Sequence, residues 1–138
     1  MDRWDEWPQV NAELQRAYAP SSSEDRLVRA VLFSDLWSPF ASSMTTLFTR
    51  LRSSSPIPLF LVDSTKHFNV ALELGVTTTP TLVFFWQGRP IKIQRSGWEQ
   101  DTKCKAYLVV GVCAEETLRR LLETAQSQVT AKGCLECS

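Results

Sequence analysis

The sequence predicts an α/β fold in which a central mixed four-stranded sheet carries helices on both faces. Short apolar segments without polar alternation, at 27–33 and 59–62, are typical of strands buried on both faces. A segment with helical spacing separates them, which favours parallel pairing. The tight turn QGR joins the apolar segments 81–86 and 90–95, which makes that pair antiparallel. In 90–95, Ile91 and Ile93 are expected to face inward, and Lys92 and Gln94 outward.

One predicted helix precedes the strand at 27–33, and a second precedes the strand at 59–62. The first has Asn11 near its start as a candidate cap and ends at Pro20. Its apolar residues are Val10, Leu14, Ala17 and Tyr18. The second begins with Ser38 as the cap and Pro39 at the first helical position. Its apolar face consists of Phe40, Met44, Leu47, Phe48 and Leu51.

Two further helices are predicted later in the chain. A short one covers 66–74 and ends at Gly75, the residue type that most often follows a helix C-terminus. The last is amphipathic, and its apolar residues are Leu118, Leu121, Leu122 and Ala125. Residues 1–130 are expected to form one domain, and residues 131–138 a flexible C-terminal tail.

Composition and charge limit the classes of function that the protein can have. The 138 residues are 43% hydrophobic and 22% charged, which is typical of a soluble globular protein. No window approaches a membrane span, and the start MDRWDEWPQV lacks an apolar signal region, so an intracellular location is expected. The formal net charge is zero, whereas a protein that grips RNA through its phosphates carries a basic surplus. RNA contact is therefore expected to be indirect or weak at most, and protein partners are favoured.

The stretch DLWSPFASS, at 35–43, has the order of a redox turn: a strand, a Trp, a Pro and then a helix. Thiol exchange needs a low-pKa thiolate at the helix N-terminus, and Ser38, Phe40 and Ala41 supply none. A serine nucleophile needs a neighbouring base. His67, the only histidine, is expected on the surface of another helix. No catalytic residue is therefore predicted.

The order strand, Trp-Pro turn, helix and Thr-Pro before a hairpin resembles thioredoxin, and Thr79-Pro80 matches its structural cis-proline. The chain is more closely similar to the spliceosomal thioredoxin-like family called Dim-one or Dib-one. Cysteines that members of this family can carry are replaced here by Ala41 and Thr81. The matching segments are WPQV, SEDRLV, Phe33 to Pro39 in the pattern F-x-x-x-W-x-P, LFLVD, TPTLVFFWQGRPIKI, and SGWEQDTK leading on to YLVV.

This resemblance implies a redox-inactive, thioredoxin-like component of the U4/U6.U5 tri-snRNP, located in the nucleus and acting in pre-mRNA splicing. It implies large spliceosomal proteins as partners. A monomer outside the complex is expected, with no cofactor, metal or membrane. Surplus aromatic residues favour a protein-binding role. The candidate partner-binding residues are Trp37, Ser38, Pro39, Trp4, Trp7 and Trp98, although core packing of Trp37 is an equal alternative.

Two other functions stay open. One is a thioredoxin-fold adaptor or co-chaperone outside splicing. The other is a thiol–disulfide oxidoreductase that uses Cys134 and Cys137 of the motif CLEC. A zinc site at CLEC would need two more ligands, and the spacing of Cys104 and Cys113 does not fit the usual pairs.

The remaining polar and aromatic residues are expected to have structural roles. Asp63, at the end of a strand, is expected to act in capping or hydrogen bonding. Trp86 is expected to be structural. The arginines expected to face solvent are Arg26, Arg29, Arg119 and Arg120.

Overall fold

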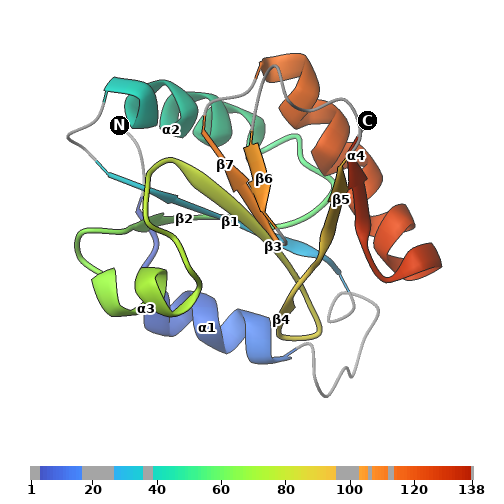
Figure 1. Cartoon of the computed structure of the whole chain (residues 1–138), viewed down its shortest axis with the longest axis horizontal. Helices are drawn as coiled ribbons and strands as arrows, with labels where there is room; N and C mark the ends of the chain where they lie inside the picture. Colours follow the sequence, from blue (N-terminus) through green and yellow to red (C-terminus); the bar gives the residue numbers. More distant parts are fainter. Residues whose placement is uncertain are drawn as a thin grey trace.

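The computed structural model describes residues 4–16, 27–35, 39–95, 103–105, 107–111 and 114–137. The elements in chain order are α1 (Trp7–Arg16), β1 (Arg29–Ser34), α2 (Pro39–Leu51), β2 (Leu59–Asp63), α3 (Phe68–Glu73), β3 (Thr81–Trp86), β4 (Arg89–Pro90), β5 (Ile93–Arg95), β6 (Lys103–Lys105), β7 (Leu108–Val110), α4 (Glu115–Lys132) and β8 (Leu135–Cys137). The mixed sheet with helices on both faces is thereby confirmed (Figure 1).

The main sheet has six strands among the described residues, in the order β2-β1-β3-β7-β6, with β4 also paired to β3. The strand β2 is parallel to β1, and β3 is antiparallel to β1. Four strands were predicted, so that number is wrong. The strands β6 and β7 were missed because each has only 3 residues, too few to show a period of two.

Successive side chains of the central strands point to opposite faces of the sheet, and this divides the core into two clusters. Ala30 and Leu32 of β1 pack in the cluster beneath α2 and α4. Val31 and Phe33 pack in the other cluster, with residues of α1 and α3. Both faces of the strand are therefore buried, as its unbroken apolar sequence predicts. Figure 1 shows α2 and α4 on one side of the sheet and α1 and α3 on the other.

The helix α3 is shorter than the predicted range 66–74, and the predicted end of the first helix at Pro20 lies outside the described residues. The helix α2 begins at Pro39, and its residues Met44 and Phe48 are fully buried, as predicted. The helix α1 begins at Trp7, so Asn11 lies inside the helix and is not its cap. Pro8 fits the first turn, where no intrahelical partner is needed for the missing N–H.

The hairpin between β3 and β4 turns at Gln87 (φ 54°) and Gly88 (φ 78°), and two positive φ values are typical of a type I′ turn. Ile91 and Ile93 are buried and Lys92 is exposed, as predicted. The single strand predicted over 90–95 is wrong, however. Only β4 and the Ile91 amide pair with β3, and the chain then leaves the sheet as β5.

The expected boundary at residue 130 is not seen. The helix α4 continues to Lys132 and ends at Gly133 (φ 73°), whose amide donates to the Val129 carbonyl at 2.7 Å. The following residues form β8, which runs parallel to β5 with Leu135 opposite Ile93. Leu135 is 0% exposed. Residues 133–137 are thus part of the fold and not the flexible tail that the sequence suggested.

One expected surface residue is buried. Arg29 is 4% exposed, and its Nη1 donates to the Leu27 carbonyl at 2.9 Å, so its aliphatic stem lies in the core. Arg119 and Arg120 are exposed as predicted, and Arg26 lies outside the described residues. No helix in the described part of the chain is long and apolar enough to cross a membrane.

Candidate functional site

The end of the sheet where β1 stops and β3 starts brings three sequence segments together. The register pairs Phe33 with Thr81, so Asp35 and Thr79 extend past the paired strands at the same end. The Thr79 hydroxyl donates to the Asp35 carboxylate and ties these two segments to each other. A few residues after Asp35 the chain enters α2 at Pro39. The start of α2 and the Thr79-Pro80 bond therefore lie at one edge of the fold.

The Thr79-Pro80 peptide bond is cis, which confirms the prediction for Pro80. The Pro80 carbonyl accepts a hydrogen bond from the Gly111 amide at 2.9 Å. The Thr81 hydroxyl donates to the Thr78 carbonyl at 2.7 Å and is itself buried. Thr78 remains exposed beside this anchored proline. The loop thus presents polar surface on a fixed backbone.

A buried hydroxyl pair fastens α2 to β1 below this edge. The Oγ atom of Ser34 and the Oγ1 atom of Thr45 lie 2.7 Å apart, and the two residues are 0% and 2% exposed. The Ser34 carbonyl also accepts from the Ser64 amide at 2.8 Å. Ser34 therefore connects the ends of β1 and β2 with the middle of α2.

We expect Thr45→Val to lower the free energy of unfolding by about 1–2 kcal/mol, because it removes a buried hydrogen bond and keeps the shape of the side chain. Urea unfolding of both proteins measures the difference. The double variant Ser34→Ala/Thr45→Val should cost less than the sum of the two single changes. Strict additivity would show that the hydroxyl pair contributes nothing.

The start of α2 carries no sulfur. Its residues are Ser38, Pro39, Phe40 and Ala41, of which Pro39 is the first helical residue. The positive end of the helix dipole, which lowers a thiol pKa in redox proteins, therefore has no thiol to act on here. The predicted partner-binding residues Trp37, Ser38 and Trp98 lie outside the described residues.

The tryptophans near the N-terminus pack partly into the core. Trp7 contacts the second cluster, and its ring centroid lies 6.2 Å from that of Phe33. Trp4 and Trp86 are half-buried against the first cluster. Trp86 is structural, as expected. For Trp4 and Trp7, part of each indole is occupied by the core, so only the remainder is available to a partner.

The segment 4–6 lies along the open edge of β2. The Asp5 amide donates to the Leu61 carbonyl at 2.6 Å. The Asp5 Oδ2 atom accepts from the Leu61 amide at 2.7 Å and from the Arg52 guanidinium at 2.6 Å. One carboxylate thus joins the N-terminal segment, the edge strand and the end of α2. These contacts could not be predicted from local sequence, because they join residues that are 47 and 56 positions apart.

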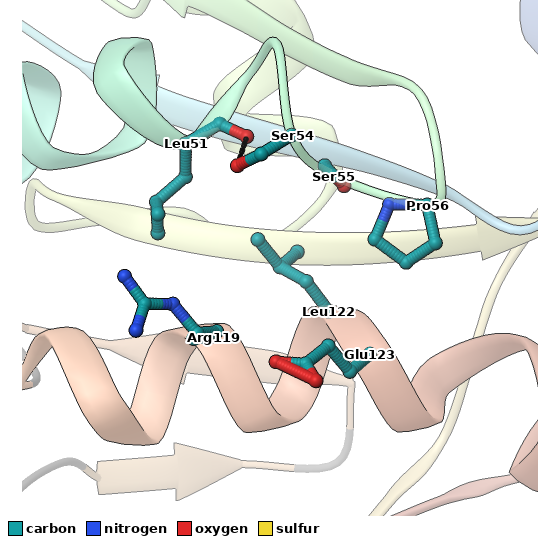
Figure 2. Close-up of a pocket in the computed structure, with 7 residues that line it drawn as sticks. All are labelled: Leu51, Ser54, Ser55, Pro56, Arg119, Leu122 and Glu123. Atoms are coloured by element: carbon teal, nitrogen blue, oxygen red, sulfur yellow. Dashed lines mark hydrogen bonds between the residues drawn. The ribbon is translucent and has the colours of Figure 1, made fainter.

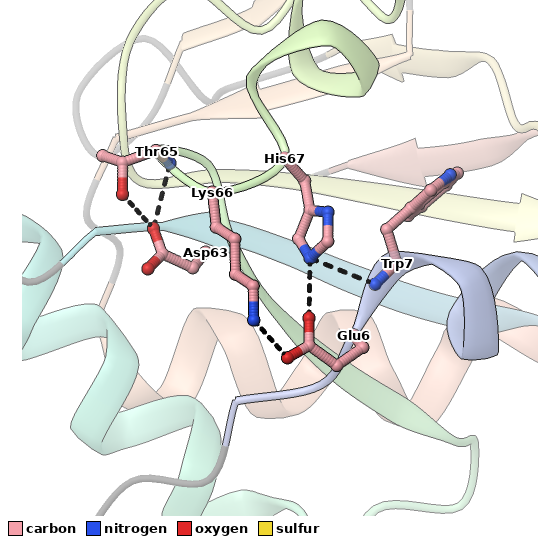
Figure 3. A network of polar contacts seen from close by, with 6 residues as sticks. All are labelled: Glu6, Trp7, Asp63, Thr65, Lys66 and His67. Carbon is pink, nitrogen blue, oxygen red and sulfur yellow. Dashed lines mark hydrogen bonds and ion pairs between the residues drawn. The ribbon is translucent and has the colours of Figure 1, made fainter.

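His67 belongs to a polar network and is not the plain surface residue that the sequence suggested. Its Nε2 atom lies 2.9 Å from Glu6 Oε2 and 3.3 Å from the Trp7 amide nitrogen (Figure 3). Its side chain is 15% exposed. The Nε2 atom can donate a hydrogen to Glu6 or accept one from the Trp7 amide, but it cannot do both at once. The shorter distance favours donation to Glu6. Neither contact involves Asp35 or Pro80, so His67 belongs to a separate part of the described structure.

Hydrogen bonds from Lys66, and secondarily from His67, lower the pKa of Glu6 below its ordinary value. Lys66 Nζ lies 2.5 Å from Glu6 Oε1, as Figure 3 shows. In the same view, the amide and hydroxyl of Thr65 donate to Asp63 Oδ1 at 2.9 and 2.6 Å. The hydrogen-bonding role predicted for Asp63 is thereby confirmed.

The lowered pKa of Glu6 predicts a pH dependence. Because the carboxylate is favoured in the folded state, its contribution is present above the unfolded-state pKa and is lost as pH falls through the folded-state pKa. The melting temperature of the wild type should therefore fall more between about pH 5 and pH 3 than that of Glu6→Gln. Thermal scans across this window measure it, with exposed Glu73→Gln as the control. Equal slopes in the wild type and Glu6→Gln would contradict the assignment.

Of the two cysteines in the motif CLEC, the described one, Cys134, lies apart from the edge that contains Asp35, Thr79 and Pro80. Cys134 is half-buried and has a free thiol. Its neighbour Gly133 lines a pocket with Trp86 and Arg89, at the end of β3 that is opposite Pro80. The side chain of Cys137 lies outside the described residues. No group of three His, Cys, Asp or Glu residues in the described ranges is arranged to hold a metal ion.

Comparison with solved structures identifies the fold. The chain is similar to thioredoxin NaTrxh from Nicotiana alata, with a TM-score of 0.61, 16% identity and coverage of 83% of each chain. It is also similar to a mutant thioredoxin from Halobacterium salinarum, with a TM-score of 0.58, 21% identity and coverage of 75% of this chain and 79% of that one. It is also similar to thioredoxin O2 from Arabidopsis thaliana, with a TM-score of 0.58, 20% identity and coverage of 86% of this chain and 88% of that one.

These likenesses show a thioredoxin-like fold, which confirms the fold class predicted from the sequence. At sequence identities of 16%, 20% and 21%, these structural similarities show the fold alone. No protein-family model matches the chain, and no curated protein matches it.

Proposed function

We propose that this thioredoxin-like protein is a redox-inactive protein-interaction module of the U4/U6.U5 tri-snRNP that acts in pre-mRNA splicing in the nucleus. Its partners are large spliceosomal proteins, and it uses no metal or cofactor. The splicing assignment rests on the sequence resemblance to the Dim-one or Dib-one family. The absence of thiol chemistry rests on the residues at the start of α2.

One observation carries the proposal. The chain has a cis Thr79-Pro80 bond at the same edge of the fold as the start of a 13-residue helix. At that helix start it has Ser38, Pro39, Phe40 and Ala41 and no cysteine. An anchored backbone without a nucleophilic sulfur suits binding, because rigid surfaces lose less conformational entropy when they associate. Zero net charge favours proteins over nucleic acid as the direct partners.

The expected mode of binding places the partner over the start of α2 and the exposed threonines before Pro80. Thr77 and Thr78 are exposed, and the Pro80 backbone beside them is fixed by Gly111. Hydroxyl groups on a fixed loop offer hydrogen bonds to a partner backbone. The first amides of α2 favour a partner carboxylate or a carbonyl oxygen.

Affinity purification tests the proposal. The tagged protein, expressed in a cell that contains its natural partners, should recover U4, U5 and U6 RNAs together with large tri-snRNP proteins. Replacing Thr77 and Thr78 together by Arg should reduce this recovery while leaving the melting temperature within a few degrees, because both residues are exposed. Recovery of chaperones alone would contradict the proposal and favour the adaptor or co-chaperone function.

A further inference from the structure

The loop after α2 faces α4 across a pocket of about 320 Å³. Figure 2 shows the loop on one side and α4 on the other. Leu51 and Leu122 form its apolar floor and are 5% and 2% exposed. The polar residues and the proline around it are Ser54, Ser55, Pro56, Arg119 and Glu123.

The hydroxyl groups of the loop differ in how they are held. Ser55 Oγ donates to the Ile57 carbonyl at 2.7 Å and accepts from the Ile57 amide at 3.2 Å. Ser54 is exposed, and its Oγ makes one long hydrogen bond, 3.3 Å to the Leu51 carbonyl. Ser53 is exposed but does not line the pocket. Among these serines, Ser54 combines an accessible hydroxyl with a position on the pocket wall.

A cation stands across the pocket from Ser54. The Arg119 side chain is 48% exposed, and its Nη2 atom lies 2.5 Å from Glu115 Oε2. Arg50 pairs with the other oxygen of the same carboxylate. Two guanidinium groups thus share one carboxylate, so Arg119 can turn toward a new anion while Glu115 keeps Arg50 as its partner.

We propose that Ser54 is a phosphorylation site and that Arg119 binds the phosphate across the pocket. A protein kinase that binds basic residues ahead of the serine would recognise Arg50, whose side chain is 61% exposed. The Ser54 hydroxyl attacks the γ-phosphorus of ATP, and a new phosphorus–oxygen bond forms. The bond between that phosphorus and the bridging oxygen breaks, ADP leaves, and the hydroxyl proton passes to the kinase.

Two opposing effects decide the sign of the stability change. A phosphate of charge about −1.5 to −2 near the C-terminal end of α2 is disfavoured by the helix dipole. A charge-assisted bond from a guanidinium is the stronger effect, because it combines attraction with directed N–H donors. The phosphate should therefore stabilise the fold when Arg119 is present and destabilise it when Arg119 is absent.

The test uses the full chain, a serine kinase with a preference for arginine ahead of the serine, and ATP with Mg²⁺. Mass spectrometry of the tryptic peptide 53–66 should locate one phosphate on Ser54, and Ser54→Ala should remove it. The melting temperature should rise by roughly 2–4 °C on phosphorylation. In Arg119→Gln the same modification should lower it, and in Glu123→Gln the rise should be larger, because a repelling carboxylate is gone.

Three results would overturn the proposal. One is the absence of phosphate from the folded chain when the kinase phosphorylates a peptide of the same sequence. Another is phosphate on Ser53 or Ser55 and not on Ser54. The third is a melting-temperature change of the same sign and size in the wild type and in Arg119→Gln, since the phosphate would then have no contact with Arg119.

Discussion

Replacing Leu135 by Ala is expected to lower the free energy of unfolding by about 2–5 kcal/mol, the usual cost of removing a buried leucine side chain. Leu135 is 0% exposed and packs in the cluster that contains α2 and α4. Its amide donates to the Lys92 carbonyl at 3.0 Å, which holds β8 against β5. A cavity at this position therefore weakens both the core and the contact between the chain end and the hairpin.

Chemical denaturation of the variant and the wild type measures this cost. The matched control is Leu72→Ala on α3, where the same atoms are removed from a side chain that is 50% exposed. The control should stay within about 0.5 kcal/mol of the wild type. Similar small effects at both positions would mean that residues 133–137 do not pack as the structure shows.

The second large effect is expected at Asp5. Replacing Asp5 by Ala should lower the free energy of unfolding by about 2–3 kcal/mol, because it removes the acceptor that the Leu61 amide and Arg52 share. The side chains of Asp5 and Arg52 are 17% and 26% exposed, so water replaces the lost contacts only in part. The open edge of β2 also loses the side-chain contact that helps to hold the covering segment, although the backbone bond from the Asp5 amide remains.

A conservative variant separates charge from hydrogen bonding at this position. Asp5→Asn keeps an oxygen that can accept from the Leu61 amide and removes the ion pair with Arg52. Its cost should be about half that of Asp5→Ala. Melting temperatures and urea midpoints measure both variants. An Asp5→Ala protein as stable as the wild type would show that the N-terminal segment contributes no stability through this carboxylate.

The central elements of the fold could be predicted because their sequences carry strong local patterns. The helix α2 has Pro39 at its first position, and Met44 and Phe48 recur on one face. The strand β3 is a continuous apolar run followed by Gly88, which supplies the positive φ of a tight hairpin. Such patterns depend only on neighbouring residues.

Other features depend on contacts between distant residues. Leu135 lies in the short segment GCLEC, which has no periodic apolar pattern, so nothing local indicates that it pairs with Ile93 and enters the core. Arg29 was expected to face solvent because of its charge, but the flanking residues of β1 are buried on both faces. The strands β6 and β7 are too short for a periodic signal.

The candidate site could be predicted only in outline. The resemblance to thioredoxin identified Pro80 as the cis-proline, and the Ser-Pro pattern placed Pro39 at a helix start. The bond between Thr79 and Asp35 was not predictable, because it arises from the register of β1 against β3. The contacts of His67 with Glu6 and Trp7 likewise join residues about 60 positions apart.

The reduction of insulin disulfides with dithiothreitol as the reductant tests most directly whether this fold serves binding and not thiol exchange. The purified protein should give the same rate as a blank without protein, and Cys134→Ser and Cys137→Ser should give that rate too, while a thioredoxin run in parallel accelerates precipitation. A rate above the blank that disappears in Cys134→Ser would contradict the account and assign an oxidoreductase activity to the C-terminal cysteines.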